Sequence, residues 1–188
     1  ADHIGYPLGD RSELHKMVKY RSLTTNWKDR QVKQDYLDMV GNCVYALAGS
    51  QSVPADQIEE AVAEAAGLTV TQFAGRLGFP RLDSGSQDPL LILANLPLPV
   101  ILTTSPYTFL EAALTKAGKT PRSTVIRWRQ DLRDLIDPRI ADVPAGREPG
   151  DFPLVCHLFG LESTSSSLVL TEDDYLEFLV DVNLGRGD

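Results

Sequence analysis

Three hydroxyl side chains, those of Thr103, Thr104 and Ser105, stand between an apolar run and a helical pattern in PVILTTSPYTFLEAAL, residues 99–114. An apolar run that becomes polar at its end is typical of a central strand in a parallel sheet. Open α/β sheets hold their ligands at the carboxyl ends of such strands. The hydroxyls therefore suit a ligand site. They equally suit a helix cap, because hydroxyls satisfy the free N–H groups of the helix that follows.

A histidine, His157, lies in a second apolar run, PLVCHLF, residues 153–159. It is two residues before Phe159, so the two share a face if one strand runs through both. An imidazole at the sheet edge could act as a general base, and with Ser105 it would form a hydrolytic pair. No small-residue pentapeptide surrounds that serine, which argues against a serine hydrolase. A core histidine with one hydrogen-bonded nitrogen is the structural alternative.

The two cysteines, Cys43 and Cys156, do not suggest a metal site. Neither has a second cysteine or a histidine at metal-ligand spacing. Cys156 is next to His157, but neighbours on a strand point to opposite faces. We therefore predict no metal site, interpret both cysteines as small buried hydrophobes, and expect the reducing cytoplasm as the compartment.

Composition limits the possible partners. The chain has 188 residues, of which 43% are hydrophobic, and a formal net charge of −8. This length suits one domain with its own core. The apolar runs are too short to span a bilayer, so no membrane partner is expected. An acidic chain lacks the basic surface that phosphate backbones require, which argues against direct contact with nucleic acid.

The pattern predicts a mainly helical part over residues 12–80 and a strand–helix–strand core over residues 89–182. In the helical part, two short amphipathic helices meet at Gly67. Acidic residues on the first of these helices would repel the phosphates of DNA, so an ordinary α-hairpin is favoured over a DNA-binding helix–turn–helix.

In the second half, strands are expected at residues 100–103, 124–128 and 153–159, with a brief strand-like run at 168–170. Alternation of strands with helices predicts the α/β class, with a parallel sheet covered on both faces. Thr171-Glu172-Asp173-Asp174 has the form of a capping box that opens the last helix.

Three segments in this order, LPLPVILTTSPYTFLEAALTKAGK, FPLVCHLFG and SLVLTEDDYLEFL, resemble the sirtuin-like domains of bacterial antiphage and conflict systems. In that family one strand ends in Thr-Thr-Asn-x-Asp and a later strand ends in His-x-His-Gly. The resemblance covers residues 89–182 and extends loosely over the helical half. It implies a Rossmann-like parallel sheet flanked by helices, with a helical insertion, as one domain over residues 1–188. It also implies that the domain's first strand and Gly-rich loop lie upstream of Ala1.

The family cleaves NAD+ at the nicotinamide–ribose bond, so the resemblance implies NAD+ as substrate or ligand. The family's catalytic asparagine corresponds to Ser105, its aspartate to Tyr107 and its catalytic histidine to Phe159. Serine is too short to replace the amide, and phenylalanine has no group that can accept or release a proton, which leaves the neighbouring His157 as the candidate base. The positions that the resemblance assigns to nucleotide binding are Thr103, Thr104, Ser105, Tyr107 and Gly160.

These substitutions predict a sirtuin-like domain of a defence or signalling protein that binds NAD+ or a related nucleotide without cleaving it. One alternative is an active NAD+ hydrolase that depletes NAD+, using Ser105 and His157 or activated by a partner. A second alternative is a non-catalytic module for structure or oligomerisation. The expected partners are other domains or subunits of a defence complex, or further copies of the chain, meeting residues 137–151 or 51–78.

Overall fold

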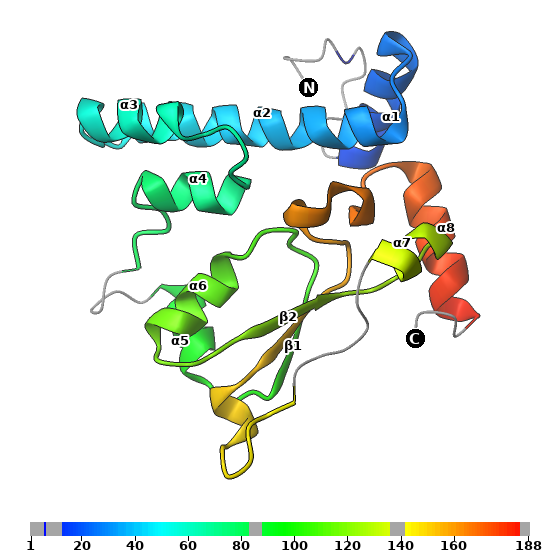
Figure 1. The fold of residues 1–188 in the computed structure, drawn as a ribbon. Coiled ribbons are helices and arrows are strands. Elements are labelled where there is room, and N and C mark those ends of the chain that lie inside the picture. The colour runs from blue at the N-terminus through cyan, green and yellow to red at the C-terminus, as the bar shows by residue number, and fades with distance from the viewer. Residues whose placement is uncertain (1–5, 7–12, 83–87, 136–141, 185–188) are drawn as a thin grey trace.

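The computed structural model has helices in its first half and a small parallel sheet in its second (Figure 1). It describes residue 6 and residues 13–82, 88–135 and 142–184, so part of the expected partner loop, residues 137–141, lies outside the described residues. The elements up to the sheet are α1 (Leu14–Thr25), α2 (Asp29–Ser50), α3 (Ala55–Ala63), α4 (Val70–Arg76) and α5 (Pro89–Asn95). The later elements are β1 (Val100–Thr103), α6 (Phe109–Lys116), β2 (Arg122–Val125), α7 (Gln130–Leu135), η2 (Pro149–Asp151), β3 (Leu154–His157), η3 (Glu162–Ser167) and α8 (Glu172–Asn183).

The three strands of this sheet are parallel and lie in the order β1-β3-β2. His157, the last residue of the central strand, is in register with Thr103 of β1 and Val125 of β2. Parallel strands of one sheet need crossover connections, and α6 lies in the connection from β1 to β2, which passes over the position of β3. The predicted α/β class, with a parallel sheet flanked by helices, is therefore confirmed. Among the described residues, no helix is long and apolar enough to cross a membrane.

Helices α5 and α6 cover one face of the sheet (Figure 1). Ile101 of β1 and Val155 of β3 are buried in one cluster with Leu114 of α6. On the opposite face of β1, Val100 is 53% and Leu102 is 64% exposed. The prediction that helices cover both faces is therefore wrong for β1, because no helix of the described residues covers its outward side chains.

The strands are shorter than the apolar runs that predicted them. β3 ends at His157, so the predicted strand at residues 153–159 extends too far, and β2 lies at Arg122–Val125 instead of 124–128. Trp128 has left the strand and is buried, and its indole N–H donates to the carbonyl of Ser167 at 3.0 Å. The expected run at residues 168–170 forms no strand. An apolar run indicates that a segment is buried. It does not show that the segment is a strand, because irregular backbone can also be buried.

The helical part forms the predicted α-hairpin from α3 and α4. Gly67 lies in its turn with φ of +90°, a conformation that favours glycine. Thr69 caps α4 by accepting from the backbone N–H of Gln72. Phe73 of α4 is buried against Ala48 of α2, which fixes the hairpin against the long helix.

A buried ion pair connects α2 to the end of the chain. Lys33 is fully buried, and its Nζ lies 2.9 Å from Asp174 and 3.1 Å from Asp29. Asp174 also accepts from the backbone N–H of Thr171, whose hydroxyl accepts from the N–H of Asp174. The predicted capping box is thus confirmed, and its carboxylate has a second task as the partner of the lysine.

Candidate functional site

The hydroxyls after β1 fold the loop in which they lie. The hydroxyl of Thr103 accepts from the backbone N–H of Ser105 at 3.0 Å, and the hydroxyl of Ser105 accepts from the N–H of Tyr107 at 3.3 Å. Such bonds make tight local turns. Thr104 is exposed. The hydroxyls therefore satisfy backbone N–H groups as the capping interpretation requires, but in the turn before α6 and not within the helix.

His157 is fully buried beneath this turn. Its Nδ1 lies 2.7 Å from the carbonyl oxygen of Ser105, and its Nε2 lies 2.7 Å from Oε1 of Glu111. A carbonyl oxygen and an ionised carboxylate only accept, so this geometry suits an imidazolium that donates from both ring nitrogens. Burial disfavours this charged form, but the hydrogen bonds to Glu111 and Ser105 outweigh it and raise the pKa of His157. In this arrangement neither ring nitrogen is free to take a proton.

Glu111 completes the charge pair from the first turn of α6. Its Oε1 also accepts from the hydroxyl of Ser123 on β2, at 2.8 Å, while its buried Oε2 has no hydrogen-bond partner among the described residues. Burial disfavours the carboxylate, but the hydrogen bonds from His157 and Ser123 outweigh it and lower the pKa of Glu111. Sequence reasoning missed this residue. The signal was an acid three residues before Leu114, on the apolar face of its helix.

The turn after β1 also holds the helical part in place. The hydroxyl of Tyr107 donates to that of Tyr36 on α2 at 3.1 Å, and burial with this bond raises the pKa of Tyr107 far above its usual range. The N–H of Thr108 donates to the hydroxyl of Thr71 on α4 at 3.1 Å. The N–H of Thr71 in turn donates to the carboxylate of Glu162, in η3. The loops after β1 and β3 and the α-hairpin are therefore hydrogen-bonded into one unit.

Phe159 does not share a face with His157, and that prediction is wrong. Because β3 ends at His157, the chain turns and Phe159 packs in a separate cluster with Trp128 and Phe178. Gly160 follows with φ of +88°, and a Cβ there would lie 2.2 Å from the carbonyl oxygen of Ser167. No side chain fits such an approach, so the glycine is required by backbone packing alone.

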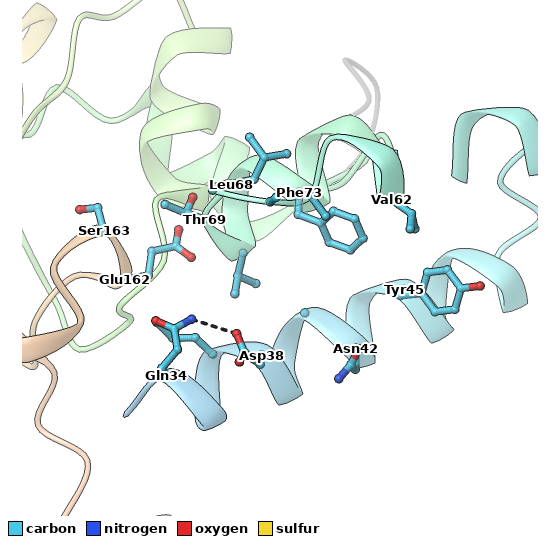
Figure 2. A pocket seen from close by; sticks show the side chains of 16 residues that line it. Gln34, Asp38, Asn42, Tyr45, Val62, Leu68, Thr69, Phe73, Glu162 and Ser163 are labelled. Atoms are coloured by element: carbon cyan, nitrogen blue, oxygen red, sulfur yellow. Dashed lines mark hydrogen bonds between the residues drawn. The ribbon is translucent and has the colours of Figure 1, made fainter. Parts of the chain in front are cut away.

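A cleft of about 760 Å³ opens beyond this turn, between α2 and the α3–α4 hairpin. Its volume is in the range of small-molecule sites. Figure 2 shows Glu162 and Ser163, which follow β3, at one end, with Tyr45 and Val62 at the other. The seven residues assigned to chemistry or nucleotide binding from the sequence do not line it. The structure thus separates the predicted strand-end residues from the cleft beside them.

The polar lining of the cleft was not found from the sequence. Its members are Gln34, Asp38, Asn42, Tyr45, Thr69, Glu162 and Ser163. Three of them, Gln34, Asp38 and Asn42, recur every four residues along α2, which is the spacing of one helix face. A polar stripe along one face of this long helix was the available signal. Among the lining residues there is no lysine or arginine. In the described part of the chain, no group of three or more metal-ligating side chains is present.

No protein-family model matches this chain, and a comparison with curated proteins finds no match. The structure by itself defines an α/β protein, with a three-stranded parallel sheet, a helical layer, and a cleft between α2 and the α3–α4 hairpin that Glu162 and Ser163 close at one end.

Proposed function

We propose that this chain is a sirtuin-like domain, with a Rossmann-like sheet, from a bacterial defence or signalling protein, and that it binds NAD+ or a related nucleotide without cleaving it. One observation carries the proposal: the cleft begins at Glu162 and Ser163, directly after the turn that leaves the central parallel strand. Ligands of open α/β sheets bind at this edge.

The lining of the cleft favours one end of the nucleotide. Carboxylates such as those of Asp38 and Glu162 suit ribose hydroxyls and a cationic ring, and without basic side chains they repel phosphates. We infer that the nicotinamide–ribose end enters the cleft. The phosphates then lie outside it, toward the exposed turn at Thr104 and Ser105.

Binding without cleavage follows from the state of the candidate base. The reaction needs a group that accepts a proton beside the ribose. His157 donates from both nitrogens and is fully buried, and Phe159 is packed against α8. Neither residue offers a lone pair to a ligand in the cleft.

Calorimetric titration of NAD+ and of ADP-ribose tests the proposal, and α2 offers a matched pair of variants. Gly41 lines the cleft and Gly49 does not, and at both positions a Cβ would enter open space. We expect Gly41→Leu to abolish NAD+ binding and Gly49→Leu to leave it unchanged. Absence of binding by the unaltered chain would refute nucleotide binding, and release of nicotinamide would refute the absence of cleavage.

The exposed outer face of β1 favours a second candidate function, the interaction module. Val100 and Leu102 are apolar, exposed and adjacent to an unpaired strand edge in the described sheet. Such edges pair readily with other chains. Sedimentation velocity of the chain and of Leu102→Lys tests this function, which predicts association that the lysine abolishes.

A further inference from the structure

Glu162 is a buried acid that has no lysine or arginine as a direct partner in the described part of the chain. The residue is 6% exposed, and both of its carboxylate oxygens accept from the same group, the backbone N–H of Thr71, at 3.2 and 3.1 Å. A carboxylate offers about four acceptor sites, and buried acids are normally paired with a cation. Within the described part of the chain no lysine or arginine forms an ion pair with Glu162. In the described part of the chain, the first turn of α4, which contains Thr71, and the imidazolium of His157, whose pKa Glu162 helps to raise, compensate this charge in part, but no direct ion pair satisfies the carboxylate.

The cleft offers that carboxylate to a ligand. Figure 2 shows Glu162 at one end, with Leu68 and Phe73 on the side of the α-hairpin and Asp38 and Asn42 on the side of α2. One wall is thus apolar and the other polar. Asp38 adds a second carboxylate, which accepts from the amide of Gln34 at 2.9 Å. A ligand that satisfies both walls has an apolar body and a positive charge.

We propose that the cleft binds a small organic cation of the arylalkylamine class. Its ammonium group donates hydrogen bonds to Glu162, and its ring packs against Leu68 and Phe73. An ammonium group brings three donors and a full charge, which meets the unfilled acceptor sites of the carboxylate. An anion of the same shape is repelled by Glu162 and Asp38. The net charge of −8 also favours the approach of cations.

The inference goes beyond nucleotide binding and does not depend on it. An amine at Glu162 fills part of the space proposed for the nicotinamide–ribose end, so the amine and NAD+ would compete. Titrating amine into nucleotide-free protein separates the two proposals. Amine binding without NAD+ binding would overturn only the nucleotide proposal, and the reverse result would overturn only this one.

The test is calorimetric titration of tryptamine, with indole-3-propionate as an anionic probe of the same ring system. We expect tryptamine to bind and the anion to give no heat. Glu162→Gln keeps an acceptor for the N–H of Thr71 but removes the charge, and should weaken tryptamine binding about tenfold or more. Glu59→Gln removes an exposed charge of α3 outside the cleft and should change nothing.

Asp38→Asn is the second variant, because Asp38 is exposed and its replacement does not disturb buried packing. It should weaken tryptamine binding about threefold through the loss of a nearby charge. Circular dichroism verifies that each variant is folded. Equal affinity for the amine and the anion would overturn the proposal, as would no binding by the unaltered chain or full affinity in both carboxylate variants.

Discussion

Nε2 of His157 lies 2.7 Å from Oε1 of Glu111, where the central strand leaves the sheet and α6 begins. The other ring nitrogen donates to the carbonyl of Ser105, and Ser123 donates to the same carboxylate oxygen. One buried charge pair therefore joins α6, β2, β3 and the turn after β1. The histidine that the sequence offered as a base holds the carboxyl edge of the sheet together.

Because of this pair, we expect the free energy of unfolding to decrease both at higher pH, where His157 loses its charge, and at lower pH, where Glu111 loses its charge. The pKa of His157 is raised, so its stabilisation is complete below its ordinary value of 6.5 and is lost as the pH rises through the raised value. The pKa of Glu111 is lowered, so its stabilisation is complete above its ordinary value of 4.5 and is lost as the pH falls through the lowered value. The pair should stabilise most between these ordinary values. Urea unfolding from about pH 4 to about pH 9 measures the dependence.

Glu111→Gln is the variant that isolates the pair. It leaves the imidazolium buried without its counter-ion, which should cost about 3 kcal/mol or more of unfolding free energy near neutral pH. The loss of stability above pH 6.5, which comes from deprotonation of His157, should shift to lower pH because the partner that raised the pKa is gone. An unchanged profile in this variant would mean that the pair does not govern the pH dependence.

Local signals in the sequence located most of the elements. The apolar runs around Ile101 and Val155 correctly predicted two strands, and the spacing of Thr171 and Asp174 correctly predicted the start of α8. These features depend on residues close together in the chain. The ends of β2 and β3 were missed because tertiary contacts, such as the packing of Phe159 on α8, decide where a strand stops.

The site was harder to predict because its partners are distant in sequence. Glu111 and His157 are separated by 46 residues, and Thr71 and Glu162 by 91. No spacing rule connects such pairs. A polar residue in an apolar stripe, as at Glu111, indicates a buried partner but does not identify it. The resemblance directed attention to the strand ends, whereas the cleft is lined by α2 and the α-hairpin, which it covered only loosely.

Gly160 should tolerate no side chain. In Gly160→Ala the Cβ would lie 2.2 Å from the carbonyl oxygen of Ser167, and the backbone φ of +88° is itself unfavourable for alanine. Gly118→Ala is the matched control, because its φ is +82° and its Cβ would meet no atom within 4 Å. The control should lose about 1 to 2 kcal/mol of unfolding free energy from φ strain alone, and Gly160→Ala distinctly more. Equal losses would show that η3 moves aside without cost.

The buried pair of Lys33 and Asp174 should contribute far more to stability than an exposed pair. Among the described residues, Asp174→Asn leaves the fully buried ammonium of Lys33 with Asp29, which is 41% exposed at its side chain, as its one remaining ion-pair partner. We expect a loss of about 3 to 5 kcal/mol of unfolding free energy. Arg76→Gln breaks the exposed pair with Glu64 and should cost less than about 1 kcal/mol. Urea unfolding of both variants makes the comparison, and similar losses would contradict a structural role for the buried pair.

Ser105 should behave as a turn residue and not as a nucleophile. Its hydroxyl accepts from the N–H of Tyr107, while His157 bonds to its carbonyl oxygen, so among the described residues no base is placed to remove the hydroxyl proton. A fluorophosphonate probe should therefore leave Ser105 unlabelled, as measured by mass spectrometry of the digested protein. Ser105→Ala should lower the unfolding free energy by about 1 kcal/mol, the usual worth of one hydrogen bond. Labelling that disappears in both Ser105→Ala and His157→Gln would instead require the imidazole to leave Glu111 and act as a base, and would restore the hydrolytic interpretation.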